Sequence, residues 1–308
     1  MPNRNLLMVV VSASLGLSLS ACGGDSVSST PPPPPTPTPT PPPPTYIKLV
    51  DITGDRTFQT GGVQYDIDGS GGFSNGTVVN FSSGTTVAYT AATDTYTLTA
   101  PGGGTTASFA PVNALPINPS QPNAQQWRVV NGTTTDILTL IVPSSSGGVP
   151  LSYMIIGSWG HQTPTGTTYR LSVGGSPTVA TDMPKTGTAN YSLAIGGGAK
   201  AGTTNYNLGG GNSTATFSAN FGTGQITTAL NLAGVPNGGT AITQFGTFNG
   251  TGTVTSSGPG FTGTLTGTNA NGIFSGAFFG PQALEMGFTY FLSGTNFSAA
   301  GAGGGIKQ

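Results

Sequence analysis

Hydrophobic and polar residues alternate with a period of two along the last third of the chain. Tyr191, Leu193 and Ile195 share one face of a first expected strand, with polar or small residues between them. Successive side chains of a strand point to opposite faces, so this pattern predicts strands with one buried and one solvated face. Seven more strands are expected at residues 215–221, 226–232, 245–254, 261–265, 273–279, 286–292 and 298–306.

Eight antiparallel strands of this kind can close into a barrel whose interior is filled by side chains. Closure also removes strand edges, which a sheet rich in threonine and poor in charge could not otherwise protect. We therefore expect an all-β fold that ends in an eight-stranded antiparallel β-barrel at residues 183–308.

The preceding segment, residues 46–182, also predicts strands, although its alternation is less regular. Proline-bearing stretches at 111–122 and 176–184 interrupt the pattern, and the second is the expected domain boundary. The segment is therefore expected to form a separate β-rich domain. Its candidate strands lie at 62–67, 77–81, 86–90, 95–99, 126–130, 136–142, 151–159 and 168–173.

The N-terminus predicts export and a lipid anchor. Arg4 precedes an apolar run, and Leu19-Ser20-Ala21 leads into Cys22, the only cysteine of the chain. Residues 1–21 therefore read as a lipoprotein signal peptide, and Cys22 is the expected acylation site. An ordinary signal peptide with an incidental cysteine is the alternative. Gly23 is not the aspartate that favours inner-membrane retention in similar lipoproteins, so we expect the outer membrane of a Gram-negative bacterium.

A proline-rich tether is expected between the anchor and the strands, at residues 22–45. Eleven of the 25 prolines fall between residues 31 and 44. Proline fixes φ and lacks a donor N–H, so such a run adopts polyproline II and forms no core. At about 3.1 Å per residue it would hold the strands roughly 40 Å from the lipid. A docking site for a proline-binding partner is the alternative.

Charge is scarce along the whole chain, and this narrows the possible partners. Charged residues make up 6% of the sequence, and Glu285 is the only one between Lys200 and Lys307. Nucleic acids and anionic membrane surfaces are recruited by clusters of lysine and arginine, so neither is expected as a partner. The 51 glycines and the abundance of threonine also disfavour helices.

Candidate catalytic and metal-binding groups are few. Residues 72–76 match G-x-S-x-G, with Asp94 or Asp136 and then His161 in hydrolase order, but no helix follows as that motif requires. Residues 66–71 resemble the start of a calcium loop, yet Thr77 replaces its glutamate. We therefore expect both segments to be turns. The sequence predicts no enzyme, no cofactor and no metal site.

Two motifs in the predicted barrel resemble those of transferrin-binding protein B. Residues 183–191 (MPKTGTANY) follow the pattern P-x-[ST]-G-x-A-x-Y, and residues 276–287 (GAFFGPQALEMG) follow G-x-F-[FY]-G-P-x-A-x-E-x-G. The chain then ends near Gly305-Ile306-Lys307, as members of that family do. The matching positions are Pro184, Gly187, Tyr191, Gly276, Phe278, Gly280, Pro281, Glu285 and Gly287.

This resemblance covers residues 183–308 and implies a β-rich handle domain before the barrel, at residues 46–182. Segments 151–153 and 157–159 are its main matches to such a handle. Full-size receptors carry two handle-plus-barrel lobes, and this length accommodates one. Their ligand-contacting loops do not align here, so no ligand-binding residues are transferred, and the motif residues are expected to be structural.

In function, the resemblance implies a non-catalytic surface lipoprotein that binds a solute or a carrier protein, such as a source of iron or haem, for uptake. It further implies an outer-membrane transporter as a partner and a Slam-type translocator for export. The alternative is a structural or adhesive surface module with no solute ligand. The scarcity of charge favours that alternative, because receptors for charged carriers usually present complementary charge.

Overall fold

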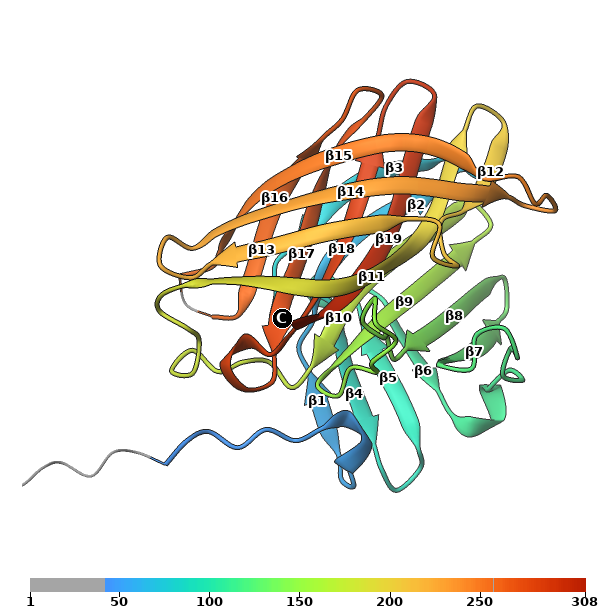
Figure 1. The fold of residues 1–308 in the computed structure, drawn as a ribbon. Coiled ribbons are helices and arrows are strands. Elements are labelled where there is room, and N and C mark those ends of the chain that lie inside the picture. Colours follow the sequence, from blue (N-terminus) through green and yellow to red (C-terminus); the bar gives the residue numbers. More distant parts are fainter. Residues whose placement is uncertain (1–41, 257) are drawn as a thin grey trace, which may run out of the picture. The chain divides into compact units, whose positions relative to one another are not determined.

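Antiparallel strands form nearly all the regular structure of this computed structural model, which describes residues 42–256 and 258–308 (Figure 1). The helical elements within those ranges are short 3₁₀ turns at Leu49–Asp51, Pro101–Gly103, Pro111–Asn113 and Pro281–Ala283. The all-β prediction is therefore confirmed. Cys22, the signal peptide and nearly all of the predicted tether lie outside the described residues.

Eight strands close into a barrel, as the alternation predicts. Each pairs with the next, and the first pairs with the last along Tyr191–Ala201 and Phe297–Lys307. A short strand that the sequence analysis did not predict, β12 (Thr204–Asn207), pairs with β11 and β14. The ring consists of β11 (Thr188–Ala201), β13 (Thr214–Asn220), β14 (Gln225–Pro236), β15 (Thr243–Val254), β16 (Gly260–Thr266), β17 (Asn271–Phe279), β18 (Glu285–Ser293) and β19 (Phe297–Lys307).

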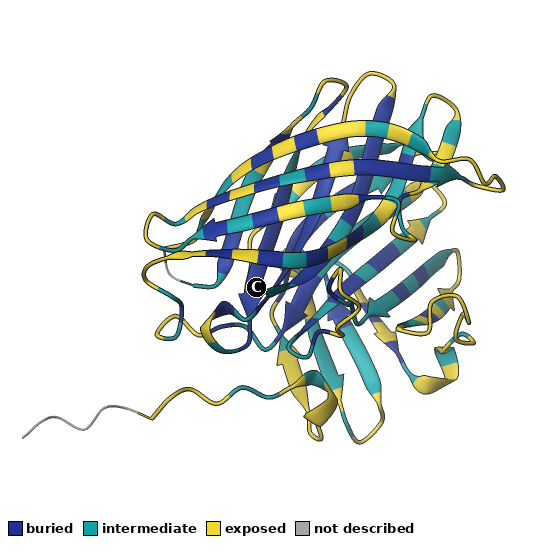
Figure 2. Cartoon of the chain, viewed as in Figure 1, coloured by how far each residue is buried: buried dark blue, intermediate teal, exposed yellow. Residues whose placement is uncertain are grey.

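The barrel interior is a packed core. Strands β13 to β15 alternate between buried and exposed residues, which Figure 2 shows as alternating bands along them. Phe217 lies at the centre of an aromatic cluster, with its ring centroid 5.1 Å from that of Phe261 and 6.0 Å from that of Phe288. The inward positions therefore supply the hydrophobic burial that closes the barrel.

Two further antiparallel sheets precede the barrel and form the handle region (residues 46–182). One has the order β1 (Arg56–Phe58), β4 (Thr86–Thr90), β5 (Thr95–Thr99), β6 (Thr106–Phe109). The other has the order β3 (Phe73–Val79), β2 (Gly61–Ile67), β10 (Gly166–Gly175), β9 (Met154–Thr163), β8 (Thr134–Ile141), β7 (Ala124–Asn131). Leu98 and Phe109 of the first sheet share a core with Leu138 and Trp159 of the second.

The six-stranded handle sheet covers the outer face of β17, β18 and β19, and we call this contact the seam. Met154 and Val173 of the handle share one cluster with Phe279, while Val63 shares another with Phe291. Strands β17 to β19 are consequently buried on both faces (Figure 2). Their barrel neighbours β13 to β16 keep one solvated face.

Glycines on β18 and β19 permit the close approach at the seam. A Cβ on Gly287 would lie 2.5 Å from Cε of Met154, and one on Gly304 would lie 2.9 Å from Cγ of Pro143. Both distances are below normal van der Waals contact, so a larger residue would push the handle sheet away. The glycine-rich end of the chain is thus explained by packing.

Residues 43–308 form one compact unit. The division of this unit into a handle domain at 46–182 and a barrel domain at 183–308 therefore stays a prediction. No helix in the described part of the chain combines the length and hydrophobicity needed to cross a membrane.

Candidate functional site

Glu285, the carboxylate of the longer motif (residues 276–287), lies at the seam where β18 begins. Its side chain is buried, with a relative exposure of 2%. Oε1 accepts a hydrogen bond of 2.6 Å from the backbone N–H of Ser152, and Oε2 accepts one of 2.8 Å from that of Tyr153. Burial raises the pKa of Glu285, and these backbone hydrogen bonds partly offset the effect. The carboxylate thus joins the barrel to the segment that leads into β9.

The remaining motif residues surround this junction. The hydroxyl of Tyr191 donates a 2.7 Å hydrogen bond to the carbonyl of Ala283. Gly280 has a φ of 69°, and a Cβ there would lie 2.6 Å from the ring of Tyr153, so a turn with glycine is required. Pro281 then opens the 3₁₀ turn that precedes Glu285.

The other motif positions are explained by packing in the barrel or by the connection that leads into β11. Phe278 is fully buried, and its ring centroid lies 5.8 Å from that of Tyr191. A Cβ on Gly276 would lie 2.1 Å from the carbonyl oxygen of Gly287. Gly187 has a φ of 83° and its carbonyl accepts from the N–H of Phe221, while Pro184 is half-buried in the connection before β11.

Asp182 connects the start of the handle region to the barrel, a role that the sequence analysis did not predict. It accepts hydrogen bonds from the Tyr46 hydroxyl at 2.8 Å and from the Gln282 N–H at 3.0 Å, and also from the Gln282 side-chain amide. Burial alone would raise the pKa of Asp182, but these hydrogen bonds hold it below its usual value. Only the position of Asp182 beside the proline-rich connection could have indicated this role.

The four side chains of a polar row cross the second handle sheet. Register places Asp136 of β8 opposite His161 of β9, His161 opposite Thr168 of β10, and Thr168 opposite Asp66 of β2. Directly opposed residues of antiparallel strands share a face, so the row lies on one side of the sheet. The sequence suggested Asp136 and His161 together only as candidates in hydrolase order, and Asp66 only in the resemblance to a calcium loop. It did not predict that these residues are neighbours on one sheet.

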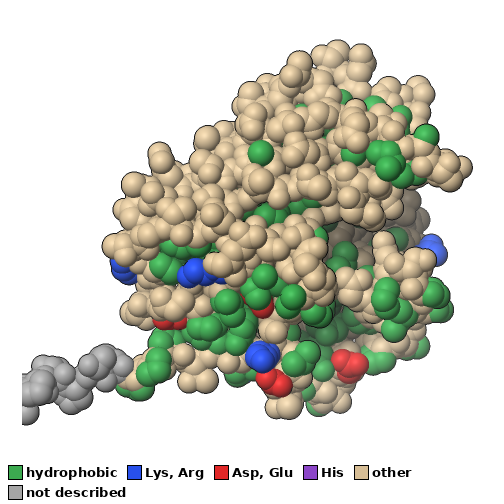
Figure 3. Space-filling view, viewed as in Figure 1, with side chains coloured by type: hydrophobic (Ala, Val, Ile, Leu, Met, Phe, Trp, Pro, Cys, Tyr) green, Lys and Arg blue, Asp and Glu red, His purple; other side chains and the backbone are tan. Residues whose placement is uncertain are grey.

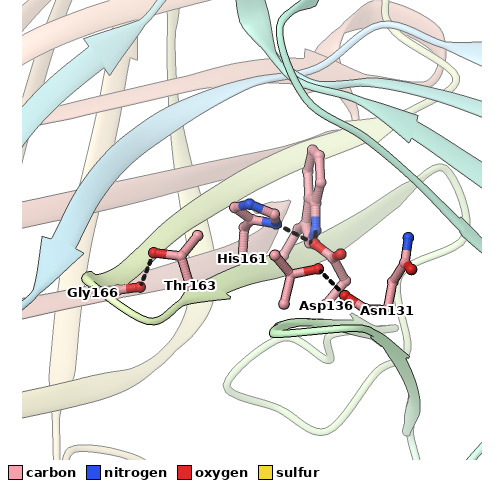
Figure 4. Close-up of polar contacts among 7 residues, drawn as sticks. Asn131, Asp136, His161, Thr163 and Gly166 are labelled. Atoms are coloured by element: carbon pink, nitrogen blue, oxygen red, sulfur yellow. Dashed lines mark hydrogen bonds and ion pairs between the residues drawn. The ribbon is translucent and has the colours of Figure 1, made fainter.

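Polar contacts join the residues at each end of this row. Nδ1 of His161 lies 2.7 Å from Oδ1 of Asp136, and the indole N–H of Trp159 donates to the same oxygen at 2.9 Å (Figure 4). Because an ionised carboxylate only accepts, Nδ1 of His161 carries the shared proton. Asp66 at the other end accepts from the Thr168 hydroxyl at 2.7 Å.

Arg170 lies beside the row and stacks on Trp159. Its guanidinium carbon lies 4.7 Å from the centroid of the Trp159 ring, a cation–π arrangement. Nε and Nη1 are buried and have no hydrogen-bond partner. Burial lowers the pKa of Arg170, while the nearby carboxylates of Asp136 and Asp66 act in the opposite direction. The row and the adjacent Arg170 therefore bring two carboxylates, an imidazole and a guanidinium together in a chain in which charged residues make up 6% of the sequence.

Neither candidate motif forms a catalytic or metal site in the described residues. The serine of G-x-S-x-G, Ser74, lies within strand β3 and not on a strand-to-helix elbow. Asp68 accepts hydrogen bonds from the N–H groups of Ser70 and Gly72, both at 2.8 Å, as in a turn. Across residues 42–256 and 258–308, no three His, Cys, Asp or Glu side chains gather to hold a metal ion.

Four clefts offer space for a ligand. One of about 350 Å³ lies at the turns around Met183, Phe221 and Val254, and the other three adjoin the handle sheets or the strands β11 and β13. Of these three, one of about 950 Å³ opens in the barrel wall between β11 and β13. Another of about 540 Å³ runs between the second handle sheet and strands β11 and β19. A third of about 340 Å³ lies between the two handle sheets and has a mainly apolar lining that includes Phe58, Tyr89 and Tyr96. Asp66, Asp136 and His161 line none of the four clefts, so the polar row has no adjoining cleft among them.

The surface between these clefts is nearly uncharged. Figure 3 shows a face on which backbone and uncharged polar atoms predominate, with a few isolated charged side chains. Only two charged residues lie between Ala201 and Lys307 inclusive, and one of them, Glu285, is buried. Recognition by the exposed barrel surface must therefore use shape, apolar contacts and neutral hydrogen bonds.

Comparison with known proteins confirms the resemblance of the barrel. Residues 183–307 match the family model described as the C-lobe and N-lobe β-barrels of transferrin-binding protein B. This segment therefore has the fold of a transferrin-binding protein B-like barrel. No curated protein sequence matches the chain.

Solved structures of similar fold come from several bacteria. A variant of transferrin-binding protein B from Haemophilus parasuis Hp5 is 14% identical, with a TM-score of 0.41, over 72% of this chain and 53% of that one. The protein from serogroup B Neisseria meningitidis is 17% identical (TM-score 0.40; 73% and 51% covered). The N-lobe of lactoferrin-binding protein B from Moraxella bovis is 13% identical (TM-score 0.33; 83% and 100% covered). The chain spans about half the length of the first two.

Proposed function

We propose that the chain is a non-catalytic surface lipoprotein that binds a protein carrying iron, haem or a similar nutrient and presents it for uptake. The match of residues 183–307 to the barrels of transferrin-binding protein B carries this proposal. The names of the similar structures refer to binding of transferrin and lactoferrin.

The geometry supports a role in binding and not in catalysis. Glu285 is held by two backbone N–H groups, and the Asp136–His161 pair adjoins none of the four clefts. The described residues thus offer no acid–base pair beside a space for substrate. A rigid β scaffold that displays uncharged loops and clefts is suited to recognising a protein surface.

The proposed location is the outer face of the outer membrane, with Cys22 as the acylated residue and the proline-rich segment as a spacer. The proposed partners are a Slam-type translocator, which would export the chain, and an outer-membrane transporter, which would receive the nutrient. Both partners are inferred from the resemblance of the barrel.

Growth on defined iron sources tests this function. A strain that lacks the chain is compared with the parent on ferric salt, haem, transferrin-bound iron and lactoferrin-bound iron. We expect normal growth on ferric salt and impaired growth on at least one carrier-bound source, with recovery when the full chain is restored. Equal growth of both strains on every carrier-bound source would contradict the proposal.

A structural or adhesive surface module is the second candidate, and one observation favours it. The exposed barrel surface presents little charge, whereas receptors for charged carrier proteins usually present complementary charge. The same pair of strains separates the two functions. Loss of surface attachment or cell–cell adhesion, with unchanged growth on all iron sources, would support the adhesive module.

A further inference from the structure

The barrel wall has an interruption between β11 and β13. Their pairing extends over three residue pairs only and ends at Asn190 and Ser218. The same register would next place Tyr191 opposite Phe217 and Ser192 opposite Thr216, but the two strands do not pair there, although both continue. The cleft of about 950 Å³ occupies this place, and residues from both strands line it.

Three extra residues in the strand opposite β11 explain the opening. From Asn190 to Gly198, β11 advances eight positions, whereas the opposing segment advances eleven, from Asn207 to Ser218. The additional residues fall in the glycine-rich connection at 208–213, between β12 and β13. The chain must bulge to accommodate them, so β13 diverges from β11 before β12 restores the pairing.

The two strands that border the opening, β11 and β13, are each paired with another strand on their other side, and we call their unpaired edges the rims. Strand β11 stays paired with β19 without a register shift from Tyr191 to Ala201, and β13 stays paired with β14 along its whole length. The rims are therefore fixed strand edges. Backbone N–H and C=O groups on such edges require hydrogen-bond partners, which neighbouring strands supply elsewhere in the ring.

A handle loop with Ser145, Ser146 and Gly148 borders one side of this wall cleft, and Oγ of Ser146 lies 2.6 Å from Oγ of Ser192. The side chains that line the cleft include none of the kinds that usually protect a strand edge. Among the twenty residues described around it, none is charged and none is proline. Exposed edges are normally guarded by lysine, by proline or by inward-pointing charges, because an unguarded edge can pair with another chain. The rim side chains that face solvent, such as Ala194 and Thr216, are small and leave the backbone accessible.

We propose that the wall cleft binds an extended peptide segment of the partner protein, which adds as a strand to the β11 or β13 edge. This inference rests on the proposed function, because it assigns part of the carrier or transporter contact to this site. Strand addition of this kind obtains affinity from backbone hydrogen bonds and selectivity from alternate side chains. It needs no charge on either side.

The residues that line the wall cleft also define the length and the side chains of a peptide that fits it. The unpaired part of β11 spans Tyr191 to Gly196, because the carbonyl of Gly197 accepts a hydrogen bond from the N–H of Leu208. At about 3.3 Å per residue this part accommodates roughly six residues of an extended chain. Leu193 and Phe217 already fill the barrel interior, so the inward positions of the guest must carry small side chains. Proline would remove donor N–H groups from the guest, which excludes the chain's own proline-rich segment as occupant.

Hydrogen exchange on the full chain with two synthetic peptides tests this proposal. The probe is the N-acetylated, C-amidated hexapeptide Thr-Ala-Thr-Ala-Thr-Ala, and its control is Thr-Pro-Thr-Pro-Thr-Pro with the same end groups. Amides of β11 and β13 that face the cleft should exchange at least tenfold faster than those of β17 and β18. The alanine peptide should slow them at least tenfold, and the proline peptide should not.

A charge on the rim should block the same binding. In Ala194→Lys, an exposed rim residue gains the kind of side chain that guards natural edges, so the alanine peptide should bind at least tenfold more weakly. Thr251→Lys is the matched control, because Thr251 is exposed on β15, which is paired on both sides. The affinity of the Thr251→Lys variant for the alanine peptide should equal that of the parent chain.

Three results would overturn the proposal: full protection of the cleft amides in the free chain, equal effects of the two peptides, or protection that appears only as the chain dimerises. The last would assign the edge to a second copy. These outcomes are separate from the growth experiment. Peptide binding with normal growth of the deletion strain would refute the proposed uptake function and leave the cleft assignment standing.

Discussion

Single residues hold the handle region against the barrel, and Glu285 is the clearest case. Its carboxylate is buried at the first position of β18 and accepts hydrogen bonds from two successive backbone N–H groups of the handle, at Ser152 and Tyr153. The sequence suggested a structural or solvated residue near the start of a strand. The hydrogen-bond partners, more than a hundred residues away, could not be predicted without the fold.

Replacement of Glu285 by glutamine should alter how stability depends on pH. Burial raises the pKa of Glu285 above its usual 4.5, so the folded chain takes up this proton more readily than the unfolded chain does. Its contribution to stability is therefore complete below pH 4.5 and is lost as the pH rises through the folded pKa. Glutamine does not titrate.

Chemical denaturation of both proteins between about pH 4 and about pH 7 measures this effect. The unfolding free energy of the parent chain minus that of Glu285→Gln should decrease as the pH rises. A difference that is constant, or that grows with pH, would show that burial does not dominate the environment of this carboxylate.

Among the elements, strands with one solvated face could be predicted from the sequence. The short strand β12 and the burial of β17 to β19 on both faces could not. Alternation located the strands from β13 to β16 because inward and outward residues differ in polarity. Strand β12 was missed because Thr-Asn-Tyr-Asn has only one apolar residue. Burial of β17 to β19 on both faces depends on the handle sheet, which no local pattern reveals.

The candidate sites were less predictable than the strands. The polar row needs the register of four strands to bring Asp66 and His161 onto one face, and these residues lie far apart in the sequence. The wall cleft depends on a three-residue excess between β12 and β13, which is visible only when both pairings are known. Only the motif residues of the barrel could be located from the sequence.

Truncation of Phe217 tests the packing of β13. This side chain is 2% exposed and contacts several aromatic rings of the barrel core. Phe217→Ala should lower the unfolding free energy by about 3 kcal/mol, the usual scale for a buried phenylalanine. Thr216→Ala, at an exposed position of the same strand, is the matched control and should change it by about 0.5 kcal/mol or less. A comparable small change in Phe217→Ala would place Phe217 outside the core.

At the scale of the whole molecule, the barrel displays a surface with little charge. Its strands are paired around the ring except where β11 and β13 separate. The seam joins handle and barrel within one compact unit through two shared hydrophobic clusters. A carrier protein bound to the barrel surface would be held by apolar and neutral polar contacts. In the proposed function, a lipid on Cys22 and the proline-rich tether hold this surface at the outer face of the outer membrane.

Removal of the proposed acylation site should release the chain from the membrane. Cys22 is the only cysteine, so Cys22→Ala leaves no alternative acceptor for the lipid. Fractionation of cells that express each form should move the variant from the membrane fraction to the soluble exported fraction. Cys22→Ala that stays fully in the membrane fraction would exclude a lipid anchor at this position.

The scarcity of charge also predicts a weak dependence of binding on salt. Added salt screens interactions between exposed charges, and this surface presents few of them. The affinity for any captured carrier should therefore change by less than tenfold between low and high ionic strength. A larger loss at high salt would show that the contact uses the few charged residues, such as those of the polar row.

Direct titration of candidate carriers tests the central claim. The full chain is immobilised through its N-terminal end, as the lipid would hold it, and is titrated with iron-loaded transferrin, lactoferrin and a haem-carrying protein. The account predicts saturable binding of at least one of them. Cooperative unfolding of the same preparation shows that the chain is folded. If this folded chain binds none of the iron- or haem-carrying proteins, the account is contradicted.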